Sequence, residues 1–370
     1  MKIRYLFFCV LMLGVSTAHA QSEVTLYGLL DTGISYVSNA GGGSQVLQQS
    51  GIMRGNRWGM KGEEDLGNGV KAIFALESGF TLENGALSQG GAEFGRQAYV
   101  GFENAYGRLT FGRQYDFVYD YLGTAYASGV FNTEYAFHPG NLDRLSGQRV
   151  DSAIKFSSKE FGGLRFGAMY AFGDPGPITS TSSTGRAVSF GATYEHGPFS
   201  AGAVYTEVND RLMTLASYFG VTSLFGQTIG TINPQTGVLT AKSVQINHTR
   251  EFGGGMSYTW NKLTLLGLVT NTSIEVGQQS AIFASYETTA SYKLQPDLFV
   301  SASYAYETFA GYRYGEIAAT IDKFLSKRTD IYATVVNLRG YDGTDVAIQS
   351  LTQSTTSSQT VFRIGMRTLF

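Results

Sequence analysis

The sequence predicts an all-β protein, a single transmembrane barrel of sixteen antiparallel strands connected up and down. Three observations lead to this fold. Segments in which apolar and polar residues alternate recur from residue 24 to the C-terminus, and the connections between them are in turn short and long. The composition, with 47 glycines, 23 tyrosines and 6 prolines, is too aromatic for a disordered chain and too rich in glycine for a helical one.

The length of the alternating segments suits a membrane. About ten residues, rising about 3.3 Å each and tilted by about 40°, span the apolar band of an outer membrane, which is about 25 Å tall. Short connections such as "EDLGN" (64–68) and "HG" (196–197) alternate with long ones such as 38–51, 115–147 and 210–247. The sixteen expected strands are 24–37, 52–63, 69–81, 93–103, 107–114, 148–157, 163–173, 185–195, 198–209, 248–260, 262–275, 280–293, 298–308, 312–324, 330–340 and 359–370.

The alternation separates charge from hydrocarbon. If "RVDSAIKF" is a strand, its side chains point alternately to two sides. One side carries Arg149, Asp151, Ala153 and Lys155, and the other carries Val150, Ser152, Ile154 and Phe156. In a soluble sandwich the apolar sides would pack together and the charged sides would meet water outside. A wide barrel in lipid reverses this arrangement, so that apolar sides face hydrocarbon and charged sides line a water-filled lumen.

The N-terminus has the three parts of a secretory signal peptide. Lys2 and Arg4 precede an apolar stretch from residue 5 to residue 15, and Ala18-His19-Ala20 is a cleavage pattern. We therefore expect a signal peptide at 1–20 and one barrel domain at 21–370. Cys9, the single cysteine of the sequence, lies inside the signal, so the exported protein would contain no disulfide.

Charge and motifs exclude several function classes. Without Lys2 and Arg4 the chain has 25 basic and 29 acidic residues, a formal charge of −4, which is not that of a nucleic-acid binder. We find no hydrolase elbow, zinc-protease helix, phosphate-binding loop or cluster of residues at metal-ligand spacing, and we predict no enzyme, no cofactor and no metal. His138, beside a proline, and His196, in a short turn, are expected to be exposed loop residues.

Long blocks of the sequence resemble the general diffusion porins of Gram-negative bacteria, most closely the β-proteobacterial branch. The blocks are "LYGLLDTGISYV", "NRWGMKGEEDLGNGVKAIFALESGF", "FGRQAYVGFENAYGRLTFGRQYD", "RVDSAIKFSSKEFGGLRFGAMYAFGD" and the closing "RIGMRTLF". The resemblance implies a homotrimer in the outer membrane, in contact with lipid and lipopolysaccharide. It also implies that the third extracellular loop folds inward to narrow the pore, and that barrel assembly machinery reads the terminal Phe370.

The resemblance also implies a charged constriction. By position, Arg57, Arg96 and Arg149 match the basic arc of the family. The inward loop would be 115–147, with Asp116, Asp120 and Glu134 as the candidate acids. Further residues expected to face the lumen are Asp31, Lys61, Lys71, Glu77, Asp151 and Lys155. Leu29 stands where enterobacterial relatives place a lysine, so the basic arc is expected to be less positive here.

A charged slot of this kind lets small hydrophilic solutes and ions diffuse through without energy input. The size and charge of a solute determine whether it crosses. The negative inward loop, Asp31 and the net charge favour cations weakly. Two other functions remain open. The first is a substrate-specific channel for sugars or small organic acids, in which the aromatic residues of 115–147 could form a track for sugars. The apolar "LMTLASYFGVTSLFG" (212–226), within 210–247, could cover a neighbouring protomer, form a short helix on the rim, or be a contact site of an adhesin or receptor.

Overall fold

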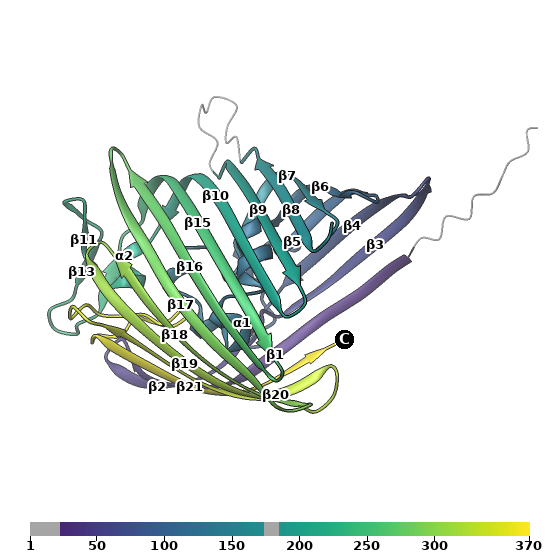
Figure 1. The fold of residues 1–370 in the computed structure, drawn as a ribbon. Coiled ribbons are helices and arrows are strands. Elements are labelled where there is room, and N and C mark those ends of the chain that lie inside the picture. The colour runs from purple at the N-terminus through teal and green to yellow at the C-terminus, as the bar shows by residue number, and fades with distance from the viewer. Residues whose placement is uncertain (1–22, 174–184) are drawn as a thin grey trace, which may run out of the picture.

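A computed structural model describes residues 23–173 and 185–370, so the expected signal peptide at 1–20 lies outside the described residues. Within them, strands wind side by side around a barrel, each antiparallel to its neighbours (Figure 1). The barrel strands are β1 (Glu23–Ala40), β2 (Gly43–Ser50), β3 (Arg57–Gly67), β4 (Val70–Gly79), β5 (Gln97–Glu103), β6 (Gly107–Tyr115), β7 (Arg149–Ser158), β8 (Leu164–Ala171), β9 (Ala187–His196), β10 (Phe199–Met213), β15 (Val244–Trp260), β16 (Leu263–Val276), β17 (Gln279–Gln295), β18 (Leu298–Phe309), β19 (Tyr312–Phe324), β20 (Thr329–Gly340) and β21 (Ser358–Leu369).

Strand β1 closes the barrel. Its residues 29–37 pair with 361–369 of β21, so the first and last strands are neighbours. On its other edge β1 pairs with two strands placed end to end, β2 and β3. These two strands are parts of one barrel strand that is interrupted between them, and the predicted sixteen-stranded antiparallel barrel is confirmed.

The second barrel strand differs from its prediction. A long connection was expected at 38–51, but the chain turns directly from β1 into β2. Gly41 and Gly42 make the turn, with φ of 68° and 104°, a conformation that glycine adopts without strain. Sequence alternation did not reveal β2 because both of its faces carry polar residues. Residues 52–56, expected to begin the next strand, instead lie outside any strand.

The faces of the strands are inverted relative to a soluble protein. In β21, Phe362 and Ile364 are 54% and 72% exposed, whereas Arg363 between them is 2% exposed. In β15, Phe252 is exposed and its neighbour Glu251 is fully buried. Apolar side chains on the outside of a closed sheet are compatible with the hydrocarbon of a bilayer, while the polar side chains lie inside the barrel.

A bulge in β7 changes the alternation predicted for 149–156. The pairing with β6 shifts register between Gly112 and Gln114, and Ser152 has φ of 52°. Past the bulge, Ala153 and Lys155 are buried as expected for one face. Before it, Val150 is buried and Asp151 is exposed, the reverse of the simple alternation. One extra residue in a strand breaks the alternation, and here it reverses the burial of Val150 and Asp151 just before it.

The connection from β6 to β7, residues 116–148, contains only short helical turns. These are η2 (Val118–Gly123), α1 (Ser128–Phe131), η3 (Glu134–Ala136) and η4 (Pro139–Asn141). Among the helices of the described residues, none has both the length and the apolar character needed to cross a bilayer. Segment 116–148 contacts β9, β10 and β15 through η2, β17 and β18 through α1, and β19 through η3.

Glycines on the strands make room for the aromatic residues of this segment. A Cβ atom on Gly167 of β8 would lie 2.1 Å from Cζ of Phe117, and one on Gly255 of β15 would lie 2.6 Å from the Tyr126 ring. Phe117 and Tyr126 are themselves buried. The glycines therefore let the segment pack closely against the wall, where any larger side chain would push it away.

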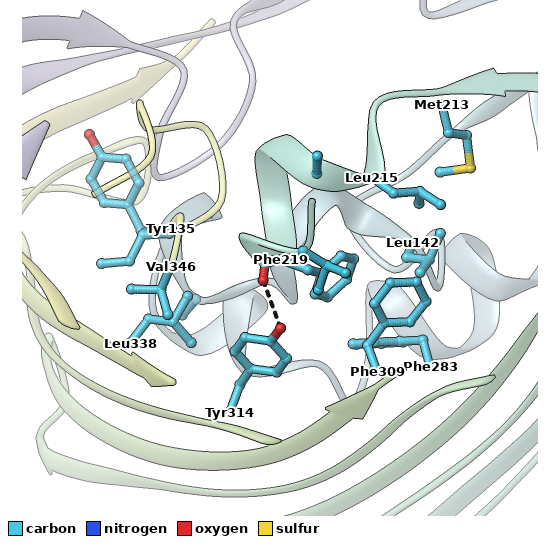
Figure 2. Packing of buried hydrophobic residues seen from close by; sticks show 14 of the residues in the cluster. Tyr135, Leu142, Met213, Leu215, Phe219, Phe283, Phe309, Tyr314, Leu338 and Val346 are labelled. Carbon is cyan, nitrogen blue, oxygen red and sulfur yellow. Dashed lines mark hydrogen bonds between the residues drawn. The ribbon is translucent and has the colours of Figure 1, made fainter. Parts of the chain in front are cut away.

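The apolar connection from β10 to β15 also packs onto the barrel. It holds α2 (Leu215–Phe219) and two small hairpins, β11 (Ser223–Leu224) with β12 (Gln227–Thr228) and β13 (Gly230–Ile232) with β14 (Leu239–Ala241). Figure 2 shows Phe219 among Phe283, Phe309 and Tyr314, which belong to β17, β18 and β19. Of the interpretations left open for this connection, the structure has a short helix, buried against the same chain rather than displayed.

Candidate functional site

Four arginines line one cavity of about 500 Å³. Arg54 comes from the break between β2 and β3, Arg57 from the start of β3, Arg96 from the connection before β5, and Arg149 from the start of β7. The opposite side is formed by segment 116–148, including Glu134. The three arginines matched to the basic arc therefore lie together, and a fourth joins them.

Arg149 is held by Tyr115, which in turn stacks on Tyr119. Its Nη2 donates to Tyr115 Oη at 2.6 Å, and its guanidinium lies 4.6 Å from the centre of the Tyr115 ring. The Tyr115 ring stacks on Tyr119 at 4.2 Å between centroids. A planar guanidinium against an aromatic face keeps its charge and a fixed orientation. Arg149 Nε has no protein hydrogen-bond partner within 23–173 and 185–370.

Arg96 and Glu77 form a buried ion pair. Arg96 Nε donates to Glu77 Oε1 at 2.7 Å, and both side chains are less than a tenth exposed. Gly55 provides the space, since a Cβ there would lie 2.9 Å from Arg96 Nη1. The charge of Arg96 is therefore largely balanced by Glu77. Arg57, in contrast, has an Nε without a protein partner in the described part of the chain.

Arg54 is a site residue that the sequence reading missed. Its guanidinium donates to the carbonyl oxygens of Met53 at 2.7 Å and Gly129 at 2.9 Å, and also to that of Val130. It thus joins the break in the second barrel strand to the end of α1. The available signal was an arginine between Gly51 and Gly55, at the point where the alternation stops.

The three candidate acids of segment 116–148 occupy different places. Asp116 is buried and accepts a hydrogen bond from Arg144 Nε of the same segment. Asp120 pairs with Lys155 and lines a separate cavity of about 190 Å³. Glu134 lines the arginine cavity, and burial raises the pKa of its carboxyl to about 7. Of the three, only Glu134 borders the cavity with the arginines.

Asp31 belongs to a buried network at the barrel closure. It accepts hydrogen bonds from the Met53 amide at 2.6 Å and from Tyr332 Oη at 2.7 Å. Arg363 Nε in turn donates to Tyr332 Oη at 2.8 Å, and its Nη1 donates to Ser35 Oγ at 3.0 Å. The carboxylate that was counted in favour of cations is therefore fully buried and bonded to neighbours; Asp31 does not itself line the cavity, although its partner Met53 does.

The remaining candidate lumen residues do not gather at the arginine cavity. Lys61 lies over the Tyr27 ring at 5.8 Å, and Lys71 forms an exposed ion pair with Glu63 at 2.5 Å. Lys155 is buried and pairs with Asp120, which is partly exposed. Asp151, moved by the bulge, is exposed and pairs with Arg113.

The expectation that His138 is exposed is wrong, because the residue is 1% exposed. Its Nδ1 lies 2.5 Å from Asp143 Oδ2, and its Nε2 lies 3.1 Å from Glu287 Oε2 of β17. The available signal was a set of carboxylates at inward positions of nearby strands, Glu251, Glu287, Glu307 and Glu316. In the described ranges, no three or more acidic, histidine or cysteine residues are placed to hold a metal ion.

A family model described as Gram-negative porin matches residues 9–343. The chain belongs to the Gram-negative porins. It is an outer-membrane porin channel for passive diffusion. The resemblance read from the sequence is thereby confirmed.

Related porins match the chain to different extents. An outer membrane porin protein of Bordetella pertussis is 33% identical over 52% of this chain, and the chain spans about half of that relative, 56% of its length. Outer membrane porin protein 32 of Delftia acidovorans is 28% identical over 95% of both chains.

Solved structures show the same fold. The anion-selective porin from Comamonas acidovorans superposes with a TM-score of 0.76 at 24% identity, over 95% of this chain and all of that one. OmpT of Vibrio cholerae, solved in a trimer form, has a TM-score of 0.67 at 15% identity, over 94% of this chain and 99% of that one.

Proposed function

We propose that the cavity of Arg54, Arg57, Arg96 and Arg149 is the pore constriction and that it favours small anions. Segment 116–148 would be the inward-folded third loop that narrows the channel. Contacts on two sides support this position, since Arg54 binds the carbonyl of Gly129 while Asn132 Nδ2 donates to Ser303 Oγ of β18 at 3.1 Å.

The imbalance of charge carries the proposal. Asp116, Asp120 and Asp143 are each bound to a base outside the arginine cavity. Glu77 balances Arg96, and Glu134, with its raised pKa, is only partly ionised at neutral pH. Glu83 also lines the cavity, but its carboxylate accepts hydrogen bonds from the amide and the hydroxyl of Ser50. Arg57 and Arg149 therefore face the cavity without an ion-paired carboxylate among the described residues. Fixed positive charge in a narrow slot with poorly screening walls attracts anions, the opposite of the preference inferred from net charge.

A channel with this constriction needs no cofactor, catalytic step or conformational cycle. An anion exchanges part of its hydration shell for guanidinium donors and leaves on the other side, because the site is open and binding is weak. The anion selectivity named for the Comamonas porin is consistent with the proposal.

Charge reversal tests the assignment. Arg57→Glu combined with Arg149→Glu should move the reversal potential in a salt gradient from anion toward cation preference in planar bilayers. Arg328→Glu is the matched control, because this exposed residue lies in the turn between β19 and β20 and lines no described part of the cavity. A reversal potential that stays at the wild-type value in the double variant would refute the constriction.

A substrate-specific sugar channel receives less support. Of the aromatic residues that could form a track, Phe117, Tyr126, Tyr135 and Phe137 are buried against the chain. An adhesin based on residues 212–226 is likewise disfavoured, because Leu215 and Phe219 are fully buried. Conductance that saturates with one neutral sugar would favour the specific channel.

The assembly follows from the same family. We propose a homotrimer in the outer membrane, exported with cleavage of residues 1–20 and surrounded by lipid and lipopolysaccharide. Phe370 supports recognition by barrel assembly machinery, since its backbone pairs with Gly28 while its ring is 51% exposed. Cross-linking of the detergent-extracted protein would show the trimer.

A further inference from the structure

His138 is part of segment 116–148 and faces the barrel wall. Its Nδ1 meets Asp143 of its own segment, and its Nε2 meets Ser285 Oγ at 3.0 Å and Glu287 Oε2 at 3.1 Å, both on β17. Glu307 Oε1 of β18 is 3.9 Å from the same nitrogen. One imidazole therefore contacts acids on three separate stretches of chain.

The surroundings of His138 are strongly acidic. Besides Asp143, Glu287 and Glu307, they include Glu251 of β15 and Glu316 of β19, all nearly or fully buried. On the side of the segment, Asp116 and Arg144 also act on Glu251 of this cluster, and they are paired with each other. Arg211 of β10 lies near that pair and Glu251. None of the four carboxylate oxygens of Glu251 and Glu307 has a hydrogen-bond partner among the described residues.

We infer that His138 is the positioning residue that holds segment 116–148 against β17 and β18 and so keeps the pore constriction in place. This rests on the proposed function, in which the segment narrows the pore. Segment and wall would otherwise present carboxylates to each other, since Asp143 faces Glu287 and Glu307 across the histidine. Like charges at such separations repel in a poorly screening interior, and a cation between them converts repulsion into attraction.

The protonation of His138 agrees with this role. Burial alone would lower the pKa of the imidazole, but Asp143, Glu287 and Glu307 together outweigh burial and hold the pKa well above its ordinary value. Because the pKa is raised, the charged imidazole stabilises the attachment of segment 116–148 to the barrel wall. This stabilisation is complete below about pH 6.5, the ordinary pKa of histidine. The gain is lost as the pH rises through the raised pKa, so the segment should dock firmly at neutral pH and loosen in alkali.

The test is single-channel recording of the full-length, membrane-inserted protein. His138→Gln keeps hydrogen-bonding groups and removes the charge, and His196→Gln is the matched control at the exposed last residue of β9. We expect closures about tenfold more frequent in His138→Gln than in wild type at pH 6, and wild-type behaviour in His196→Gln. Heat-dependent mobility in gels confirms that each barrel is folded.

Two further measurements separate positioning from simple packing. Wild type and His196→Gln should close more often as the pH is raised into the alkaline range, whereas His138→Gln should show no such rise. The double variant His138→Gln with Glu287→Gln should close less often than His138→Gln, because the wall loses one uncompensated charge. Equal closure rates in wild type and His138→Gln, or an alkaline rise that persists in His138→Gln, would overturn the role of His138. Neither result bears on the reversal potential, which tests the constriction itself.

Discussion

The hydroxyl of Tyr314 in β19 donates to the backbone carbonyl of Phe219, the last residue of α2, at 2.8 Å (Figure 2). The Phe219 ring lies 4.4 Å from that of Phe309 and 5.7 Å from that of Phe283, between centroids. The connection from β10 to β15 is thus attached to strands far from it in the chain. In this part of the barrel, the inward side chains build an ordinary hydrophobic core instead of lining water.

Phe219→Ala should detach this connection. Removing a fully buried phenylalanine costs about 3–5 kcal/mol through lost burial and the cavity left behind. Denaturant unfolding of the detergent-solubilised protein should show this loss, and a protease should cut between residues 214 and 243 sooner than in wild type. The control is Ile232→Ala in β13, which is 46% exposed and should change stability by less than about 0.5 kcal/mol. Equal stabilities of the two variants would contradict the packing described.

Two neighbouring glycines should respond differently to alanine. A Cβ on Gly255 would lie 2.6 Å from Cγ and 2.9 Å from Cβ of Tyr126, so the ring cannot turn away without moving its backbone. A Cβ on Gly267, in the adjacent strand β16, meets nothing within 4 Å. Gly255→Ala should therefore lower the free energy of unfolding by roughly 1–3 kcal/mol, the range for overpacking.

The control for that prediction is built into the sheet. Gly267→Ala should leave the unfolding midpoint within the experimental scatter of wild type. If Gly255→Ala also leaves the unfolding midpoint unchanged, the aromatic residues of segment 116–148 do not need the glycines in order to pack against the barrel wall.

Ion preference should depend on pH through Glu134. Burial raises the pKa of this carboxyl to about 7, so it is neutral below that pH and negative above it. Lowering the pH from 8 to 6 removes one negative charge from the arginine cavity and should raise the anion-to-cation permeability ratio by roughly twofold. Glu134→Gln should show the high ratio at both pH values. A wild-type ratio that falls on acidification would show that another group controls the charge of the pore.

Alternation was sufficient to predict most of the barrel wall. Phe362, Ile364 and their equivalents face outward because each strand has a period of two and the surrounding hydrocarbon selects apolar side chains. It failed where the period is broken. The bulge before Ala153 moved Asp151 outward, and the break at 51–56 brought Arg54 to the site, in both cases because the backbone leaves the regular ladder.

Pairing of charges could not be predicted from the sequence. Segment 116–148 carries several carboxylates, and counting them favoured cations. In the structure Asp116 is bound to Arg144, Asp120 to Lys155 and Asp143 to His138. Each partner is 5 to 35 positions away along the chain. A carboxylate that is already bound to a base adds little to the electrostatic potential at a distance. The ion preference of the pore therefore depends on which charges pair in the folded chain.

The sequence by itself determined that this chain is a membrane barrel of sixteen strands, because the period of its apolar residues and the lengths of its connections leave few other ways to satisfy the backbone in lipid. The tertiary structure decided which charges meet. It brought four arginines to one cavity, placed His138 among wall carboxylates and packed Phe219 onto β17, β18 and β19. These contacts join residues distant in sequence, and their energies depend on separations and burial that no local pattern encodes.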